Sequence, residues 1–374
     1  MDIEICRMTG AEFPLFAFSH CRDVVAAVSR AGGFGVLGCS SYGSHQLEEE
    51  LAWIDAHVDG KPYGVDILFP NTQQAESGMS LDDFIAAIPA AHIDFVVELL
   101  ARHDVQIRRD EVIRQRLPPT APDEAERLLE IAFRHPIKLI ANALGVAPPL
   151  MIERGKATGV PVAALVGAKD HAIKQVRAGV DIIVAQGGEA AGHCGEVSTM
   201  VLVPEVIRAV APYGAPPVLA AGGIVTGEQM AGAMAMGAQG AWTGTVWLAT
   251  SDAETSPVIR EKMIAARSID TVRSTARSGK PNRQLKSAWN AAWDSPDSPG
   301  ALPLPLMPLI SVPAMNKTLR AAEAGSQRAR ELATYESGQG VGMIESVRSA
   351  TAVVQDFKEE FAAAFERFNR FVGG

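Results

Sequence analysis

Short apolar segments rich in β-branched residues alternate with amphipathic segments through most of this chain. Such alternation is typical of βαβ units, whose strands form a parallel sheet with helices outside it. Eight units in succession satisfy the requirement of a closed barrel, so we predict an α/β fold of the (β/α)8 TIM-barrel type. The candidate strands are Leu15 to Phe18, Gly35 to Leu37, Tyr63 to Leu68, Lys138 to Ala141, Val160 to Val166, Ile182 to Ala185, Val218 to Ala220 and Gly240 to Thr243.

Segments between the candidate strands carry apolar residues at three- and four-residue spacing, which predicts amphipathic helices. The predicted helices are Asp23 to Ala31, Gln46 to His57, Glu124 to Phe133, Lys169 to Ala178, Pro204 to Val210 and Gly227 to Met236. In a barrel of this kind the ligand binds at the C-terminal ends of the strands, where the βα loops meet. Motifs that follow strand ends are therefore the first candidates for a functional site.

Two regions interrupt the alternation and set the predicted domain boundaries. The chain has 374 residues, which is enough for two domains or for one barrel with additions. We predict a barrel domain over residues 1–250, with a helical insertion at 70–119, and a C-terminal extension over 251–374 whose helices pack on the barrel. The insertion includes Leu81 to Leu100, a helical pattern interrupted at Pro89, which is a candidate lid.

The extension contains a proline-rich stretch and two helical patterns. Six prolines between Ser295 and Pro313 predict an extended connector, because each proline removes a backbone donor and restricts the residue before it. Helices are predicted over Asn316 to Glu331 and over Ile344 to Phe371. The second pattern carries phenylalanines at helical spacing, which predicts a buried apolar stripe. The stripe consists of Phe357, Phe361, Phe365 and Phe368.

Charge and cysteine usage narrow the class of function. Acidic residues outnumber basic ones, 43 to 34, and the net charge of −9 favours a small-molecule substrate over nucleic acid, whose backbone requires clustered Lys and Arg. No apolar run is long enough to span a membrane, and the N-terminus lacks the pattern of a secretory signal. The four cysteines have no metal-binding spacing. We expect a cytoplasmic enzyme without a metal.

The segment after the sixth candidate strand has the composition of a binding loop. Gln186 ends the strand, and its amide can donate to and accept from the edge of a heteroaromatic ring. Gly187, Gly188 and Gly192 allow close approach of the backbone to a ligand. His193 follows them and is a candidate acid–base group, although a histidine that is only hydrogen-bonded within its loop is the alternative.

Small residues also follow the seventh and eighth candidate strands. Gly222 and Gly223 come after one strand, and Gly244 and Thr245 come after the next. TIM barrels commonly bind phosphate at these two loops, through backbone N–H groups and the N-terminus of a helix. Two such sets on consecutive units favour a phosphate site over the alternative that the glycines only make tight turns.

One segment matches the consensus sequence of a dinucleotide-binding motif but lacks the strand and helix that must flank that motif. Gly33, Gly35 and Gly38 satisfy GxGxxG, and Asp55 follows at about the usual separation. That motif must follow a strand and open a helix, whereas these glycines follow a helical segment. We interpret Gly32 and Gly33 as a helix end that leads into the second strand. GxSxG, Walker A and HExxH motifs are absent, which leaves redox chemistry on a bound organic cofactor.

Five separated segments together resemble nitronate monooxygenases, formerly called 2-nitropropane dioxygenases. The resemblance covers most of the chain and keeps the motifs in the family's order, although the 70–119 insertion has no counterpart. It implies an FMN-containing TIM barrel that oxidises alkyl nitronates with molecular oxygen. The segments are AAVSRAGGFGVLG (Ala26 to Gly38), AQGGEAAGHCG (Ala185 to Gly195), AAGGI (Ala220 to Ile224), GAQGAWTGT (Gly237 to Thr245) and SGQGVGMI (Ser337 to Ile344).

The resemblance also implies roles for individual residues. His193 matches the family's catalytic histidine, and Gln186 matches the amide residue that contacts the flavin. The FMN phosphate would lie against the two sets of small residues, and the end of the first strand would lie beneath the flavin ring. The implied cofactor-binding residues are Ala17, Phe18, Ser19, Asp66, Gln186, Ala191, Gly192, Gly222, Gly223, Trp242, Thr243, Gly244 and Thr245.

Three positions depart from the family's pattern. Asp66 stands where an asparagine is usual, and an ionised carboxylate there would oppose electron uptake by the ring. Ala191 stands where a glycine is usual. Met307, in a proline-rich segment that resembles the one over the family's pocket, stands where an aromatic residue is common. These departures bear most on the choice of substrate.

Two other functions fit the same features. FMN-dependent enoyl-ACP reductases and NADH:quinone reductases share this barrel and much of the histidine motif, so reduction of the flavin by NAD(P)H is the main alternative. A barrel that binds a phosphorylated ligand without catalysis is the other. The expected partners are a small-molecule substrate and O2, with no nucleic acid and no membrane, and a homodimer is compatible with the sequence.

Overall fold

The computed structural model describes residues 1–69, 80–114 and 122–372. Eight parallel strands form a closed barrel in which each strand pairs with the next and the last pairs with the first. All eight predicted strands, and the fold class, are therefore confirmed. The strands are β1 (Leu15–Ser19), β2 (Phe34–Gly38), β3 (Tyr63–Asp66), β4 (Ile140–Asn142), β5 (Val162–Val166), β6 (Ile182–Gln186), β7 (Val218–Ala221) and β8 (Ala241–Thr243).

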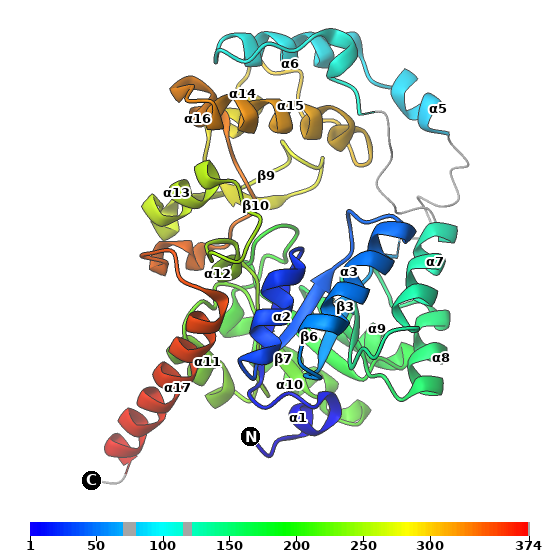
Figure 1. Ribbon diagram of the computed structural model, residues 1–374, viewed down its shortest axis with the longest axis vertical. Helices are drawn as coiled ribbons and strands as arrows, with labels where there is room; N and C mark the ends of the chain where they lie inside the picture. The colour runs from blue at the N-terminus through cyan, green and yellow to red at the C-terminus, as the bar shows by residue number, and fades with distance from the viewer. Residues whose placement is uncertain (70–79, 115–121, 373–374) are drawn as a thin grey trace.

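Helices surround the barrel (Figure 1). The six predicted helices are all present, although one of them begins at Thr199 rather than at Pro204. The helix that starts at Pro149 was not predicted; its proline stands in the first turn, where a missing N–H breaks no helical hydrogen bond. No helix within the described ranges has the length and apolarity needed to cross a membrane. The outer helices are α2 (Arg22–Arg30), α3 (Ser44–His57), α7 (Pro122–Ala132), α8 (Pro149–Thr158), α9 (Lys169–Ala178), α10 (Thr199–Val210) and α11 (Gly227–Ala235).

The eighth outer helix comes from the far end of the chain. Only the short α12 (Thr245–Leu248) directly follows β8, and the long α17 (Ala350–Val372) packs against both α11 and α2. These are the two neighbours that an eighth barrel helix has. The contact with α11 is close, because a Cβ atom at Gly227 would collide with the carbonyl oxygen of Phe357. Residues at the C-terminus of the sequence thus complete the ring of helices.

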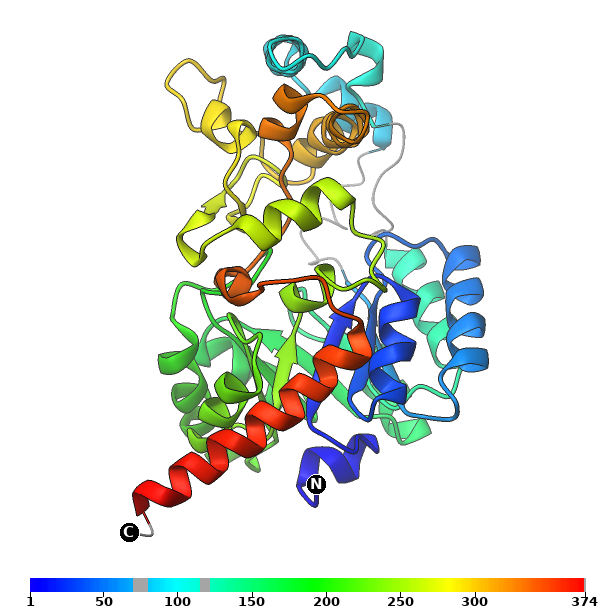
Figure 2. The same cartoon turned by 60° about the vertical axis from the view of Figure 1, so that its left-hand side comes forward.

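The predicted phenylalanine stripe of α17 is buried only in its first half. Phe357 is buried, and Phe361 packs edge-to-face on Phe13 with ring centroids 5.6 Å apart. Phe365 and Phe368 are each 60% exposed, so the prediction that they belong to the core is wrong. The helix keeps its apolar period beyond the surface that α2 and α11 offer, and its last turns extend away from the other helices (Figure 2).

Strand side chains alternate between two apolar layers. The outer layer lies between the strands and the helices, whereas the inner layer fills the barrel and includes Phe16 and Trp242, whose rings stack 6.2 Å apart. Ile5, on α1 (Glu4–Thr9), belongs to the inner layer and closes the N-terminal end of the barrel. The opposite end, formed by the C-terminal ends of the strands and the loops that follow them, is called the barrel mouth below.

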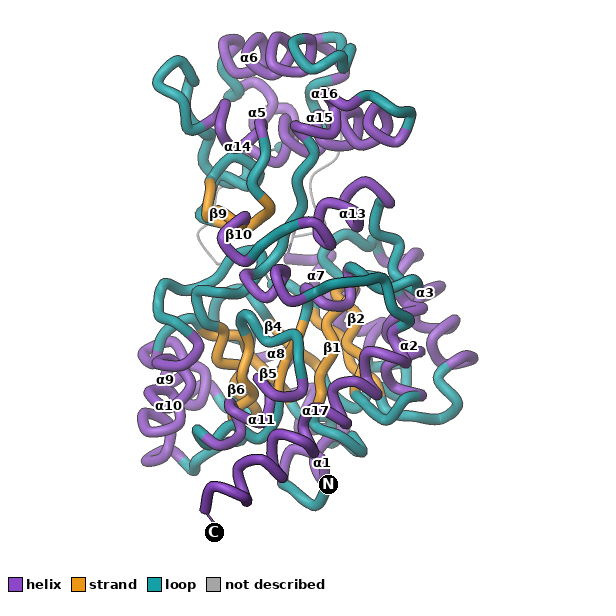
Figure 3. Tube along the Cα trace, turned by 90° about the vertical axis from the view of Figure 1, so that its left-hand side faces the viewer, coloured by secondary structure: helices purple, strands orange, loops and turns teal. Residues whose placement is uncertain are grey.

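A helical cap built from the insertion and the extension lies beyond the barrel mouth (Figures 1 and 3). The candidate lid forms two helices on either side of Pro89, and its second helix packs on the extension, where Phe95 meets the edge of Trp293 at 4.7 Å. The predicted helix over Asn316 to Glu331 is split in two. The cap elements are α5 (Leu81–Ala86), α6 (Ala90–Ala101), α13 (Pro257–Ala265), β9 (Thr271–Ser274), β10 (Asn282–Leu285), α14 (Ala288–Trp293), α15 (Leu306–Glu323) and α16 (Gln327–Leu332).

The predicted extended connector is wrong in its last part, because α15 begins at Leu306. Pro308 lies in the first turn, where the backbone donors have no partner within the helix. Pro313 lies inside the helix and deprives the carbonyl oxygen of Leu309 of its helical donor. The backbone N–H of Arg114 donates to that oxygen at 2.7 Å. A hydrogen bond from the insertion thus replaces the one that Pro313 removes from the helix.

Candidate active site

Three of the predicted site residues point into the barrel mouth from strand ends. Phe18, Asp66 and Gln186 lie at the C-terminal ends of β1, β3 and β6. The residue before each of them belongs to the outer apolar layer, so alternation turns these three side chains inward. One aromatic, one carboxyl and one amide side chain therefore face the mouth from three different strands.

Four other predicted residues do not direct their side chains there. Ala17 belongs to the outer layer, and the Ser19 hydroxyl accepts the backbone N–H of Cys21 at 3.1 Å. The Thr243 hydroxyl accepts the indole N–H of Trp247 at 3.0 Å, on the outer side of the barrel. Trp242 lies in the inner layer, stacked within the barrel. Any contact of these four residues with a ligand in the mouth is left to their backbone.

Thr199, the first residue of α10, joins the loops after β6 and β7. Its backbone N–H donates to the Glu189 carboxylate at 2.9 Å. Its hydroxyl lies 2.9 Å from both that carboxylate and the carbonyl oxygen of Gly222. A Cβ atom at Gly222 would lie 2.6 Å from the Thr199 hydroxyl, and the φ angle of +108° there favours glycine. Packing of the two loops thus requires glycine at this position.

The loop after β8 combines open space with a structural contact. A Cβ atom at Gly244 would have no heavy atom within 4 Å, so the backbone there borders free space. The hydroxyl of Thr245 accepts the backbone N–H of Gly338 at 2.9 Å. Thr245 is therefore engaged with a segment of the extension, and only its backbone is available for a ligand.

Residues 337–340 (SGQG), the first four of the SGQGVGMI segment, cross the loops after β6, β7 and β8. The backbone N–H of Gln339 donates to the carbonyl oxygen of Glu189 at 2.8 Å. A Cβ atom at Gly338 would lie 2.7 Å from the same oxygen, and one at Gly340 would lie 2.6 Å from the carbonyl oxygen of Gly223. This segment joins four of the five sequence motifs at one place, although they are far apart in the chain.

The β9–β10 hairpin holds the loop that carries His193, and the sequence did not predict it. Gly192 and Arg283 exchange both backbone hydrogen bonds, at 2.8 and 3.0 Å. The Arg283 side chain donates from Nε to the carbonyl oxygen of Gly188 at 2.9 Å. Arg273, on β9, reaches the carbonyl oxygen of Cys194 at 3.4 Å. Two arginines of the extension thus fix a loop of the barrel.

His193 lies at the rim of the mouth with an exposed ring. Its Nδ1 atom is 3.1 Å from the carbonyl oxygen of Pro281, in the turn before β10. Because a carbonyl oxygen only accepts, this contact places a proton on Nδ1 and leaves Nε2 as the acceptor of the neutral ring. The extension therefore sets the orientation of the candidate base.

Glu336 is a charged neighbour of His193 that the sequence analysis missed. Its Oε1 atom lies 3.0 Å from Nε of Arg277 and accepts from the amide of Asn282 at 3.2 Å. Burial raises the pKa of Glu336, but Arg277, the backbone N–H of Glu336, Asn282 and His193 together bring that pKa below its ordinary value. A carboxylate that is ionised at neutral pH thus stands beside the histidine loop. Its position directly before SGQG is the only signal that the sequence offered.

Asp66 has a different environment. Its residue surface is 3% exposed, and among the residues that the structure describes its Oδ1 atom has no hydrogen-bond partner. Burial raises the pKa of Asp66 to about 7, although the backbone N–H of Ala143 acts in the opposite direction. Below neutral pH, burial thus favours the protonated form of Asp66 over the ionised carboxylate considered in the sequence analysis.

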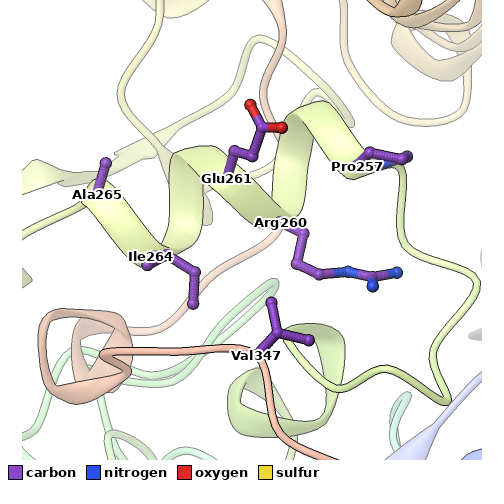
Figure 4. Close-up of a pocket in the computed structure, with 6 residues that line it drawn as sticks. All are labelled: Pro257, Arg260, Glu261, Ile264, Ala265 and Val347. Carbon is purple, nitrogen blue, oxygen red and sulfur yellow. The ribbon is translucent and has the colours of Figure 1, made fainter.

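Two cavities lie apart from the residues of the mouth. The larger has a volume of about 450 Å³ and lies beneath α13, opposite Val347 (Figure 4). Arg260 extends into it, but its guanidinium donates to the carbonyl oxygens of Ala253 and Thr255 at 3.1 and 3.0 Å. The smaller, about 320 Å³, lies between the loop that contains Val225 and the start of α17. Arg260 therefore ties down the chain after α12 rather than serving as a free cation.

Comparison with known proteins decides the family. Residues 17–360 match the family model described as nitronate monooxygenase. The chain belongs to the nitronate monooxygenase family. A relative from Mycobacterium tuberculosis, named as a monooxygenase, is 50% identical over 369 residues, which cover 96% of both chains. A Staphylococcus aureus relative that is named as a nitronate monooxygenase is 28% identical and covers 79% of this chain and 82% of its own. The predicted family is confirmed.

Solved structures support the same fold. Nitroalkane oxidase from Streptomyces ansochromogenes aligns with a TM-score of 0.76 at 21% identity, over 97% of this chain and 99% of that chain. FabK from Thermotoga maritima aligns with a TM-score of 0.71 at 24% identity, over 98% of both. At these identities the likeness concerns the fold alone. Membership of the nitronate monooxygenase family makes the chain a flavin-dependent oxidoreductase, as the sequence predicted.

The mouth has features that fit a flavin nucleotide. Gly244 borders open space, so that a ligand can approach the backbone after β8. Asp66 offers a buried Oδ1 atom that has no partner in the described part of the chain, and Gln186 offers an amide on the same inner face. The backbone donors on one side suit the phosphate end of such a ligand, and the polar side chains on the other side suit the edge of its ring.

Proposed function

We propose that this chain is an FMN-dependent enzyme that oxidises alkyl nitronates with molecular oxygen, and neutral nitroalkanes where a base removes their α-proton. The observation that supports this most is the junction of the loops after β6, β7 and β8 with residues 337–340. Residues from separate family motifs share that junction. A phosphate and a planar ring are the groups for which such a barrel mouth is suited.

Different residues would contact the two ends of the cofactor. The backbone at Gly222, Gly223 and Gly244 would hold the phosphate, since two of these glycines have positive φ angles and the third borders open space. Gln186 and Asp66 would face the edge of the ring. When bound, the flavin supplies the electron chemistry, and the protein supplies position and electrostatics.

His193 would act on the substrate from the rim of the mouth. Its Nε2 atom would accept the α-proton of a neutral nitroalkane while Nδ1 keeps its hydrogen bond to the Pro281 carbonyl. The ionised carboxylate of Glu336 stands beside the loop that carries His193. With a nitronate, which has already lost that proton, His193 would only orient the nitro group.

Anaerobic reduction of the flavin tests this proposal directly. Purified protein is loaded with FMN, and its visible absorbance is followed under argon after addition of a nitronate, NADH or NADPH. We expect bleaching by the nitronate. Bleaching by NADH or NADPH alone would instead support the reductase alternative. A colourless protein that takes up no FMN would favour the third possibility, a barrel that binds a phosphorylated ligand without catalysis.

Other sequence predictions are not tested by the structure. A boundary between domains at residue 250, a cytoplasmic location and a homodimer stay predictions. One observation bears on the first of these. Because α17 (Ala350–Val372) closes the ring of barrel helices, we expect removal of the whole extension to unfold the barrel.

A further inference from the structure

The structure isolates one carboxyl group at the inner edge of the barrel mouth. Asp66 ends β3, and its predecessor Val65 belongs to the outer layer, so Asp66 faces inward. Its register partners are Gly38 on β2 and Ala141 on β4, neither of which has a polar side chain. The carboxyl thus has backbone and apolar groups on both sides.

Among the described residues, no Lys or Arg side chain stabilises the charged form of Asp66. The thiol of Cys39 lies close on the β2 side, and burial together with Asp66 raises the pKa of that thiol well above its ordinary value. The ring of His20, after β1, lies over Gly38 and binds the Gly38 carbonyl oxygen through Nδ1 at 2.8 Å. On the β4 side the backbone N–H of Ala143 is the favourable neighbour.

A buried carboxylate without a cation or a full set of donors is costly, so the neutral acid is favoured. Burial accordingly raises the pKa of Asp66 to about 7. Among the described residues its buried Oδ1 atom has no hydrogen-bond partner, so the carboxyl group can form one more hydrogen bond. An asparagine at this position could make a similar hydrogen bond but could not bind or release a proton.

We propose that Asp66 takes up a proton when a flavin bound in the barrel mouth is reduced. This inference rests on the proposed function. Two electrons from the substrate, or from dithionite in the test below, would leave the ring more negative. The ionised Asp66 carboxylate would then take one proton from solvent, in addition to any proton that the ring itself binds. The neutral acid then donates a hydrogen bond toward the reduced ring. Negative charge on the ring and on Asp66 would otherwise repel each other at short range in a site of low dielectric.

The reduction equilibrium of the FMN-loaded protein gives the first test. Wild type and D66N are titrated with dithionite and reference dyes between pH 6 and pH 9. Above about pH 7 we expect the reduction constant of wild type to fall tenfold more per pH unit than that of D66N, which is about 30 mV per unit for a two-electron couple. Equal slopes in the two proteins would overturn the proposal.

A matched control variant is available on α17. Burial also raises the pKa of Glu360, which accepts the backbone N–H of Gly227 outside the barrel. E360Q therefore removes a partly buried carboxyl whose pKa is also raised, without touching the mouth. Its pH slope should equal that of wild type, and a change as large as that of D66N would show that the effect is not specific to Asp66.

Infrared difference spectra provide a readout that does not depend on potentials. At pH 8, reduction of the FMN-loaded wild type should add the carbonyl band of a protonated carboxyl, and D66N should lack that band. Absence of the band in wild type would contradict the proposal while leaving the proposed function intact. Failure of both proteins to take up FMN would contradict the proposed function and the proton coupling together.

Discussion

The two ends of β3 place polar groups in opposite situations. At the N-terminal end the Tyr63 hydroxyl donates to one oxygen of Asp55 at 2.6 Å, and Nδ1 of His135 lies 2.6 Å from the other oxygen. At the C-terminal end, within the described part of the chain, Oδ1 of Asp66 has no partner. One strand of four residues thus separates an aspartate that has hydrogen bonds to both oxygens from an aspartate that has one oxygen without a partner.

This difference indicates which end of the strand is available to bind a ligand. Buried polar groups in proteins are usually paired, so an unpaired one needs an explanation. In TIM barrels the N-terminal face serves stability and the C-terminal face carries the active site. The Asp55 network fits the first role. Asp66 fits the second, because it ends β3 at the barrel mouth and its Oδ1 atom has no partner in the described part of the chain.

Replacing the candidate base should have the largest effect. In H193N we expect kcat/KM for a neutral nitroalkane to fall by about 10² to 10⁴, because the Nε2 acceptor is lost. Turnover of the corresponding nitronate should fall less, since no proton has to be removed. Steady-state rates with both substrates, at equal FMN content, measure the difference. As a control, H45N alters an exposed histidine of α3 and should change neither rate. Full activity of H193N on the nitroalkane would show that His193 is not the base.

Replacing Asp66 should change how stability depends on pH. The folded-state pKa of about 7 lies above the ordinary value of 3.8, so folding favours the protonated form. That stability is complete below about pH 4 and is lost as the pH rises through 7. Relative to wild type, D66N should therefore gain on the order of 2 to 4 kcal/mol between pH 4 and pH 8. Urea unfolding of the FMN-free proteins at both pH values measures this gain, and a constant difference would show that Asp66 is not buried as described.

Distorting the phosphate side of the mouth should have a smaller effect. In G222A the new Cβ atom would lie 2.6 Å from the Thr199 hydroxyl, at a φ angle of +108°. We expect FMN to bind about tenfold to a hundredfold more weakly, or about 1.4 to 2.7 kcal/mol, which fluorescence titration of FMN measures. G159A has a similarly positive φ of +70° at the end of α8 but no heavy atom within 4 Å of the new Cβ. Equal loss of FMN affinity in G159A would place the effect outside the mouth.

Local pattern predicted the barrel better than it predicted the site. Alternation was enough to predict the eight strands, and the glycine motif indicated the loop that follows Gln186. The hairpin that holds His193 could not be predicted, because Arg283 donates to Gly188, which lies 95 positions earlier in the chain. Burial decides the proton on Asp66, and the length of the covering helices decides which phenylalanines of α17 are buried, as the exposed Phe365 shows. These properties depend on distant partners and leave no local signal.

The smallest expected effect is at the N-terminal end of β3, and it tests the contrast between the two ends. Y63F removes the donor to Asp55 and should cost about 1 to 2 kcal/mol of unfolding free energy, because an acceptor loses its partner. FMN affinity should not change, since Tyr63 lies at the end of the strand away from the mouth. Y213F, which alters an exposed tyrosine that contacts Arg177, should change neither quantity. If Y63F weakened FMN binding as much as G222A does, the two ends of the barrel would be coupled, and the separation of stability from function along β3 would not hold.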